Sequence, residues 1–239
     1  MSGFDPDSFF TLHADLPREG PGETADVAWA AEVAQLESGA RVLDAACGPG
    51  GDIGALLRAA ATGHVTALDS HAPFIAAAAT RFGHHGRVSL QVGDMAAVTG
   101  PYDLIWCAGA VYFLGINAAL STWRKALADG GVIAFSEPCF FVDDPSEDAR
   151  AFWDGYAAQS AGGIAVQIAA AGYDLVATRK LSDVAWESYY RPMEARIAAL
   201  RHGASRELAS VLDEGAAEIS RWRQHRAETG YLLCVVRPK

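Results

Sequence analysis

Short apolar runs alternate along the chain with longer helical stretches, and glycine or aspartate usually separates them. This alternation is typical of an α/β fold, in which helices cover both faces of a mostly parallel sheet. The pattern predicts seven strands, at Arg41–Ala46, His64–Asp69, Val88–Val92, Tyr102–Cys107, Gly131–Glu137, Tyr173–Leu181 and Tyr231–Arg237. It predicts helices at Ala25–Glu37, Ile53–Ala61, Pro73–Arg81, Ile116–Asp129, Ser146–Gln159 and Ala161–Ala171.

A long segment, residues 182–230, separates the sixth predicted strand from the seventh. Pro192 is expected to open one helix there, and a second amphipathic stripe runs from Leu208 to Trp222. Because the sixth strand should run parallel to the first five, its end opens onto the face where α/β sheets bind ligands. We therefore predict three parts: an N-terminal segment over the active site at 1–24, a core at 25–181 and 231–239, and a helical cap at 182–230.

Composition and charge narrow the choice of partners. The 239 residues are 51% hydrophobic, which suits one α/β domain with an appended subdomain. The formal net charge is −10, with eight basic against 21 acidic residues in 1–178 and 11 against eight in 179–239. An acidic body of this kind argues against a nucleic-acid partner, which needs a concentrated basic face.

The N-terminus and the apolar runs of the chain lead us to expect a cytoplasmic protein. The first residues lack a basic and an apolar region of the secretory type, and no apolar run reaches the roughly 18 residues of a membrane span. The four cysteines form no CxxC pair and fall on or beside strands, so we expect buried thiols, and the histidines show no metal-ligand spacing. We expect a small-molecule substrate, no membrane, no metal, and leave a homodimer open.

The stretch from Val42 to Asp52 joins a buried strand to a glycine turn and then to a helix start. Gly48 and Gly50 permit positive φ and let the backbone approach a ligand closely. The dinucleotide fingerprint would place a third glycine where this chain has Ile53, and an acid at position 44 is a poor neighbour for a pyrophosphate. A nucleotide-like ligand is therefore expected here. The missing glycine and the acid at position 44 argue against an NAD-linked oxidoreductase, which we keep as the less favoured alternative.

The pattern Asp44-x-x-x-Gly48-x-Gly50 resembles motif I of the class I S-adenosylmethionine (SAM) methyltransferases. That resemblance implies a Rossmann-like fold with an antiparallel last strand and SAM as the cofactor. It also implies that Asp69 accepts hydrogen bonds from the ribose, that Asp94 faces the adenine while its neighbour packs on the ring, and that Gly109 lies beside the methyl donor. The expected cofactor-binding residues are Asp44, Ala46, Gly48, Gly50, Asp69, Ser70, Asp94, Met95 and Gly109.

Four further segments carry a closer resemblance: Leu16–Gly22, Gly109–Tyr112, Ser136-Glu137 and Trp186–Pro192. Together they look like a group of bacterial SAM-dependent methyltransferases that largely lack an assigned substrate. In that group an acid usually precedes the Gly-Ala pair after the fourth strand, whereas this chain has Ala108. The role of that acid cannot be carried over, which keeps open a protein that binds SAM without transferring its methyl group.

The acceptor side is expected to contain a proton acceptor and polar anchors. Glu137 at the end of the fifth strand and Tyr112 are the candidate catalytic residues, although Glu137 could equally cap a loop or pair with an arginine. Arg18, Tyr189, Tyr190 and Arg191 are the candidate substrate-binding residues. Two arginines would suit a small carboxylate-bearing molecule, with an oxygen or nitrogen acceptor. About two of six aromatic residues are expected at the site: Tyr112, Trp153, Tyr156, Trp186, Tyr189 and Tyr190.

Overall fold

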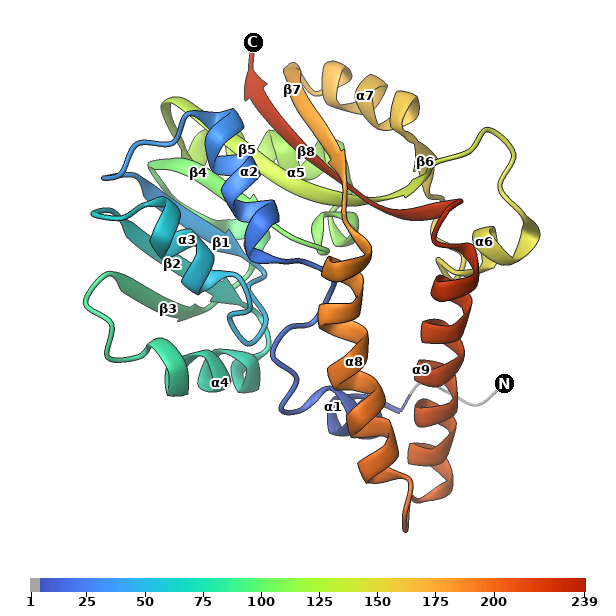
Figure 1. Cartoon of the computed structure of the whole chain (residues 1–239). Helices are drawn as coiled ribbons and strands as arrows, with labels where there is room; N and C mark the ends of the chain where they lie inside the picture. Colours follow the sequence, from blue (N-terminus) through green and yellow to red (C-terminus); the bar gives the residue numbers. More distant parts are fainter. Residues whose placement is uncertain (1–4) are drawn as a thin grey trace.

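A single twisted sheet runs through the computed structural model, which describes residues 5–239 (Figure 1). Along its main path the strand order is β3-β2-β1-β4-β5-β8-β7, and the short strand β6 pairs with β5 off this path. The strands are β1 (Arg41–Ala45), β2 (His64–Asp69), β3 (Val88–Val92), β4 (Tyr102–Cys107), β5 (Leu127–Phe140), β6 (Gln159–Ser160), β7 (Tyr173–Lys180) and β8 (Thr229–Pro238).

Strand direction confirms the predicted α/β sheet. Strands β1 to β5 pair in parallel, for example Val42 with Leu104, whereas β8 runs antiparallel to both of its neighbours, β5 and β7. The main path therefore holds seven strands with an antiparallel last strand. Strand order reverses between β1 and β4, and in open α/β sheets such a switch point opens a crevice at the carboxyl ends of the strands.

Helices cover both faces of this sheet. They are α1 (Pro6–His13), α2 (Thr24–Ala34), α3 (Ile53–Ala59), α4 (Ala72–Phe82), α5 (Ile116–Trp123), α6 (Glu147–Ala151), α7 (Ala161–Ala170), α8 (Asp183–Leu200) and α9 (Arg206–His225), with 3-10 turns η1 (Met95–Ala97), η2 (Val111–Phe113) and η3 (Arg124–Ala126). Alternate residues of β1 enter two separate cores, Val42 with α2, α3 and the cap helices and Leu43 with α5 and α7. Because both faces are buried, the central strands read as continuous apolar runs.

Helices α8 and α9 lie between β7 and β8 in the chain, within residues 182–230. They run side by side beyond the end of the sheet, and α1 packs against both (Figure 1). Arg223 of α9 ties the pair together because its guanidinium donates to Glu187 at 2.7 Å and to Glu194 at 2.6 Å. Their apolar stripes meet around buried Met193 and Leu212, which belong to the same core as α1.

The predicted start of the first cap helix at Pro192 is wrong. Helix α8 begins at Asp183 because the Ser182 hydroxyl accepts from the backbone N–H of Ala185, which satisfies a free donor of the first turn. Pro192 lies in the middle of the helix. The proline received too much weight in the prediction, and the serine cap was overlooked.

Two other predicted helices are shorter than expected. The predicted helix Ser146–Gln159 ends at Ala151, because Asp154 and Gly155 both take positive φ, at 45° and 82°. The predicted helix Ile116–Asp129 ends at Trp123, and β5 already begins at Leu127. The glycine turn at 129–131 is present inside that strand, where the pairing of β4 with β5 shifts register.

The four cysteines, Cys47, Cys107, Cys139 and Cys234, are buried and unpaired. Burial raises the pKa of each of these thiols. In residues 5–239, no helix is both long and apolar enough to cross a membrane.

Candidate functional site

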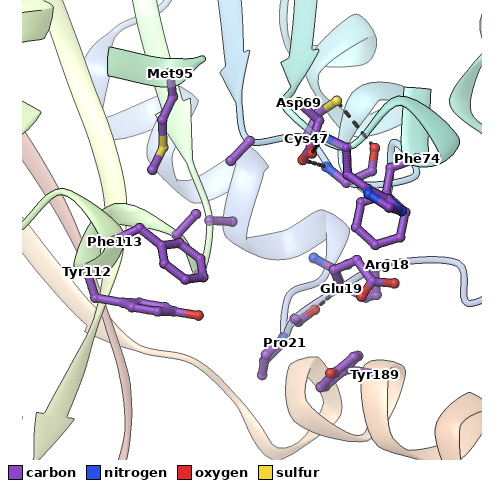
Figure 2. Close-up of a pocket in the computed structure, with 18 of the residues that line it drawn as sticks. Arg18, Glu19, Pro21, Cys47, Asp69, Phe74, Met95, Tyr112, Phe113 and Tyr189 are labelled. Atoms are coloured by element: carbon purple, nitrogen blue, oxygen red, sulfur yellow. Dashed lines mark hydrogen bonds between the residues drawn. The ribbon is translucent and has the colours of Figure 1, made fainter. Parts of the chain in front are cut away.

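A cavity of about 730 Å³ opens at the carboxyl ends of β1, β2 and β4, beneath α1 and the cap helices. Figure 2 shows Asp69, Cys47 and Phe74 on one side of it, and Tyr112 and Phe113 on the other. Eleven of the predicted site residues line it: Arg18, Asp44, Ala46, Gly48, Asp69, Ser70, Asp94, Met95, Gly109, Tyr112 and Tyr189. Four predicted residues do not belong to the lining: Gly50, Glu137, Tyr190 and Arg191.

The glycine loop after β1 forms part of the cavity floor. Ala46 and Gly48 take positive φ, at 59° and 53°, which turns the backbone sharply after the strand. Asp69 at the end of β2 fixes this turn, because its carboxylate accepts from the backbone N–H of Gly48 at 2.9 Å and of His71 at 2.8 Å. Gly50 faces away from the cavity: a Cβ there would lie 2.9 Å from the Ile53 side chain.

Asp44 contributes an unsatisfied carboxylate to this floor. The residue is 3% exposed, and its Oδ2 atom has no hydrogen-bond partner. Burial raises the pKa of Asp44 well above the usual range, the charges of Asp52 and Asp69 raise it further, and Arg18 opposes them. A buried acceptor without a donor is costly, so this atom marks a place where a ligand's donor would be stabilised.

Glu19 provides a second unsatisfied oxygen at the same cavity. Its Oε2 lies 2.6 Å from His13 Nδ1, while its Oε1 is buried without a partner. Burial raises the pKa of Glu19, and the hydrogen bond to His13 works in the opposite direction. Glu19 therefore adds to the acidic character of the floor, and neither it nor His13 was among the predicted site residues.

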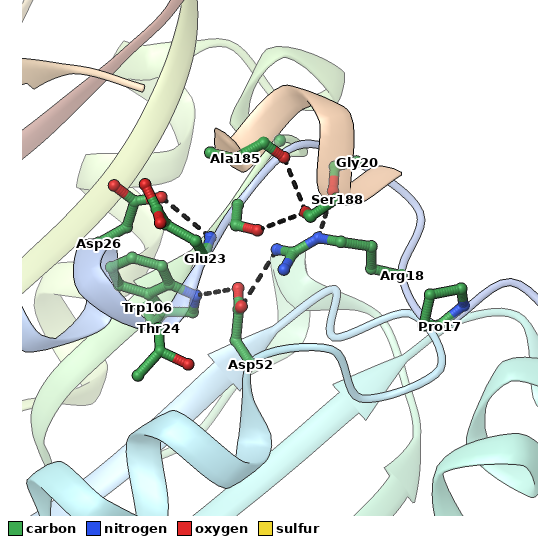
Figure 3. Close-up of polar contacts among 12 residues, drawn as sticks. Pro17, Arg18, Gly20, Glu23, Thr24, Asp26, Asp52, Trp106, Ala185 and Ser188 are labelled. Carbon is green, nitrogen blue, oxygen red and sulfur yellow. Dashed lines mark hydrogen bonds and ion pairs between the residues drawn. The ribbon is translucent and has the colours of Figure 1, made fainter. Parts of the chain in front are cut away.

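Arg18 holds the segment before α2 against the glycine loop (Figure 3). Its Nε donates to the Gly20 carbonyl at 2.5 Å and its Nη2 to Asp52 Oδ1 at 3.1 Å. The other Asp52 oxygen accepts from Trp106 Nε1 at 3.0 Å. Arg18 thus lines the cavity as a paired cation. Arg191 is 78% exposed on α8, where it forms an ion pair with Glu187 at 3.5 Å, outside the cavity lining.

The 3-10 turn η1 presents Met95 to the cavity. Asp94 caps this turn, because its Oδ1 accepts from the backbone N–H of Ala96 at 2.8 Å. Both residues line the cavity beside Asp69 and Ser70. An acid, a thioether and two further polar groups are therefore gathered at the ends of β2 and β3.

Gly109 lies where the floor passes from β4 to the aromatic side of the cavity. It takes a φ of +69°, and its N–H donates to the Ser136 hydroxyl at 2.7 Å. A Cβ at this position would lie 3.9 Å from the Tyr231 hydroxyl oxygen, so the glycine backbone is close to that ring. Tyr112, in the 3-10 turn that follows, is buried enough for its pKa to rise to about 12.

Glu137 lies behind the cavity wall and is connected to the cavity by a hydrogen bond with a tyrosine. The residue is 3% exposed, its Oε1 accepts from the Tyr156 hydroxyl, and its Oε2 has no partner. Burial raises the pKa of Glu137 to about 7, and the Tyr156 hydrogen bond limits the rise. Tyr156 lines the cavity and so connects the carboxylate with its contents.

Aromatic side chains make up much of the remaining wall. Five of the six aromatic candidates line the cavity, more than the two expected; Tyr190 is the exception. Its hydroxyl instead donates to Glu218 Oε1 at 2.9 Å, and Glu218 of α9 belongs to the lining. Sequence reasoning missed Glu218, because one acid on a predominantly polar helix face carries no distinguishing signal.

Helix α1 was not predicted as an element, yet it closes one side of the cavity. Phe10 stacks on His71 with ring centroids 3.9 Å apart, and Phe9 and His13 also belong to the lining. The first four residues of the predicted N-terminal segment lie outside the described residues. Within residues 5–239, no three His, Cys, Asp or Glu side chains are grouped closely enough to hold a metal ion.

Comparisons with known proteins agree with this geometry. The profile of a family described as "Methyltransferase domain" matches residues 42–131, from β1 into β5. A curated relative, trans-aconitate 2-methyltransferase from Streptomyces avermitilis, is 34% identical over 113 residues. That match covers 45% of this chain and 42% of the relative, so the similarity spans less than half of either protein.

Solved structures match almost the whole chain. A SAM-dependent methyltransferase from Thiobacillus denitrificans, in complex with S-adenosyl-L-homocysteine, has a TM-score of 0.81 at 20% identity, covering 99% of both chains. Its counterpart from Geobacter sulfurreducens, with the same ligand, has a TM-score of 0.83 at 21% identity, covering 98% and 99%. A [4+2]-cyclase has a TM-score of 0.69 at 19% identity, covering 92% and 86%. The chain therefore has the fold of the SAM-dependent methyltransferases, and its residues 42–131 match the methyltransferase domain family.

Proposed function

We propose that this protein is a SAM-dependent methyltransferase that acts on a small molecule. The observation that carries the proposal is the unpartnered, buried Oδ2 of Asp44 beside a glycine loop that Asp69 holds in place. SAM offers an ammonium group, ribose hydroxyls and an adenine amino group, and all three are donors. The cavity floor presents carboxylate acceptors in the region where a nucleotide-like ligand binds to this type of sheet.

The residues present fit each part of that cofactor. Asp44 and Glu19 each offer an unsatisfied oxygen suited to the ammonium group. Asp69 already accepts two backbone N–H groups, and its remaining lone pairs can accept from ribose hydroxyls. Asp94 can accept from the adenine amino group, with Met95 packed on the ring. The cofactor would supply a methyl group on a positively charged sulfur.

Methyl transfer of this kind is an in-line displacement, so the protein contributes mainly by holding the acceptor and excluding water. The cavity is suited to this role. Helix α1 and the cap helices close it, and aromatic rings form much of its wall. The absence of a side chain at Gly109 lets an acceptor approach the backbone beside β4.

The paired Glu137 and Tyr156 can receive the acceptor's proton. Tyr156 faces the cavity and donates its own proton toward Glu137 Oε1. If the acceptor loses a proton to the Tyr156 oxygen, the tyrosine proton passes to Glu137, and the hydroxyl is restored. Glu137 therefore acts as the final base, and burial raises its pKa to about 7, near the value that suits a base at neutral pH. Tyr112 is then a positioning group at the cavity wall.

The sequence-based expectation of a carboxylate-bearing acceptor finds limited support. It rests on Arg18 and Arg191 and on the partial similarity to a trans-aconitate methyltransferase. Arg18, however, is paired with Asp52, and Arg191 lies outside the cavity lining. The proposed acceptor is accordingly a small molecule without a required carboxylate.

A second candidate function is SAM binding without methyl transfer. Ala108 stands where the resembling group has an acid, and a cyclase shares the fold. Titration calorimetry with SAM, S-adenosylhomocysteine and NAD tests whether the protein binds the ligand that both functions require. An assay for the formation of S-adenosylhomocysteine from SAM, over a panel of amines and alcohols, then distinguishes methyl transfer from binding alone. Binding of S-adenosylhomocysteine with turnover supports methyl transfer. Binding without turnover supports the second function, and binding of NAD alone refutes both.

A further inference from the structure

The acceptor side of the cavity combines negative charge with aromatic rings. We propose that it selects an amine acceptor, with Glu218 as the counter-ion of the protonated amine and the rings of Tyr112, Trp186, Tyr189 and Tyr231 as its walls. This inference rests on the proposed methyltransferase function and specifies the acceptor class.

The charge balance of the lining disfavours an anion as the natural occupant. Seven lining residues are acidic, one is an arginine, two are histidines and none is a lysine. The arginine, Arg18, is paired with Asp52 at 3.1 Å, and His13 lies 2.6 Å from Glu19. Arg18 and His13 therefore already face acids, and an anionic ligand would add to an acidic site. A cation would reduce the repulsion instead.

Glu218 enters the cavity from the cap. It comes from α9 of the cap, whereas Asp44 and Asp69 come from the sheet. The charge of Glu218 raises the pKa of Tyr112, Tyr189 and Tyr231, so the carboxylate and these three hydroxyls share one region. The Tyr231 hydroxyl lies beside Gly109. Glu218 is thus grouped with the residues around the expected methyl position.

Glu218 is also held in a fixed orientation. One of its oxygens accepts from the Tyr190 hydroxyl at 2.9 Å, and Tyr190 itself is fully buried. That contact fixes one oxygen of a carboxylate that belongs to the cavity lining. A carboxylate positioned by one buried donor can form a charge-assisted hydrogen bond with an ammonium group at little further ordering cost.

The rings are fixed as firmly as the carboxylate. Trp186 stacks on Tyr231 with centroids 5.4 Å apart and on Trp222 at 5.0 Å. Trp153 meets Tyr231 edge to face at 5.2 Å. Rigid tyrosine and tryptophan faces attract cations, most strongly where water is excluded. They retain that attraction when an amine gains methyl groups and loses its N–H donors.

The transfer step conserves charge and electrons. The bound ammonium loses one proton, through Tyr156 to Glu137, and becomes a neutral amine. Its nitrogen lone pair forms a bond to the methyl carbon as the carbon–sulfur bond breaks, and the electron pair of that bond stays on sulfur as a thioether. The positive charge moves from sulfur to nitrogen, so the product is again a cation beside Glu218.

The test uses the full-length protein saturated with S-adenosylhomocysteine and three probes of one shape but different charge. These are choline, its uncharged carbon analogue 3,3-dimethylbutan-1-ol, and the anion 3,3-dimethylbutanoate. Calorimetry with the unmodified protein, Glu218→Gln and Glu214→Gln measures each affinity. Glu214 is an exposed acid on the same helix that accepts from Ser210, outside the cavity lining, and so gives a matched control.

We expect choline to bind more tightly than the neutral and anionic probes. Choline has no N–H donor, so it tests the charge of Glu218 alone, and Glu218→Gln should weaken choline alone by about tenfold. Glu214→Gln should leave all three affinities unchanged, and all three proteins should bind S-adenosylhomocysteine equally. Equal binding of choline and its neutral analogue, preference for the anion, or no choline binding at millimolar concentration would overturn the inference. Loss of S-adenosylhomocysteine binding by the unmodified protein would instead overturn the proposed function.

Discussion

Replacing Asp44 by asparagine should weaken SAM binding and stabilise the free protein at the same time. Asp44 is 3% exposed, and its Oδ2 atom has no partner in the described structure. The substitution keeps the shape of the side chain and removes its charge. If the carboxylate serves to bind the cofactor's ammonium group, it costs stability in the free protein and contributes binding energy in the complex.

The size of the effect on affinity follows from the type of hydrogen bond that is lost. A hydrogen bond to a charged group contributes about 1.5–3 kcal/mol, and one between neutral groups about 0.5–1.5 kcal/mol. Exchanging carboxylate for amide should therefore cost about 1–2 kcal/mol, which weakens SAM and S-adenosylhomocysteine binding by roughly 5- to 30-fold.

The effect on stability has a defined dependence on pH. Burial raises the pKa of Asp44 in the folded protein above its ordinary value of 3.8. The folded state therefore binds the proton more tightly than the unfolded state, and stability is lost as pH rises through the folded pKa. An asparagine side chain has no such proton to lose, so Asp44→Asn and the unmodified protein should diverge above about pH 4, with the variant more stable by on the order of 1 kcal/mol near pH 8.

Calorimetry with S-adenosylhomocysteine and urea unfolding between about pH 4 and pH 8 measure both quantities. Asp129→Asn is the control, because Asp129 is exposed near the amino end of β5, whereas the cavity lies at the carboxyl ends of the strands. It should change neither quantity. Unchanged affinity in Asp44→Asn, or a variant that is less stable than the unmodified protein at the alkaline end of this range, would refute the role given to this carboxylate.

Three further substitutions test other parts of the site. Asp69→Ala removes the acceptor of two backbone N–H groups, which is also the acceptor proposed for the ribose hydroxyls. S-adenosylhomocysteine affinity measured by calorimetry should therefore fall by about 1–3 kcal/mol, and a smaller loss would contradict the proposed role of Asp69. Glu137→Gln should reduce turnover by about 100-fold and abolish the rise in rate through pH 7 that ionisation of Glu137 gives the unmodified protein. A retained pH midpoint near 7 would show that another group is the base. Trp222→Ala should lower the free energy of unfolding in urea by about 3–5 kcal/mol, because Trp222 is 1% exposed between α8 and α9, and a loss below about 1 kcal/mol would mean that the cap is not packed as described.

The sheet and most helices could be predicted because their signals are local. A buried parallel strand must be apolar throughout, and runs such as 64–69 and 102–107 were placed within a residue of their observed ends. The errors occurred where a single local feature was given too much weight. Pro192 suggested a helix start, although the Ser182 cap lies ten residues earlier. The helix predicted to reach Gln159 ends at Ala151, shortly before the positive φ of Asp154 and Gly155.

The grouping of the residues predicted to bind the cofactor has the same local origin. Its residues follow directly after strands, so their order along the chain fixes their place at one edge of the sheet. Of the nine predicted cofactor-binding residues, eight line the cavity, and Gly50 is the exception because its loop turns it toward α4. The acceptor side depends on tertiary contacts between segments far apart in sequence. Glu218 meets Tyr190 across 28 residues, and Tyr156 meets Glu137 across 19.

Those contacts explain why the sequence favoured a carboxylate-bearing acceptor and the structure favours an amine. Counting charges along the chain shows 11 basic residues after position 178, which suggested an anion-binding cap. Within the folded cap, Arg223 pairs with Glu187 and Glu194, and Arg191 is exposed, so these cations hold helices together or face solvent. Glu218 is the acid of the cap that lines the cavity. The sign of a segment's net charge therefore did not predict the sign of the surface it presents to a ligand, because pairing within the fold decides which charges are left over.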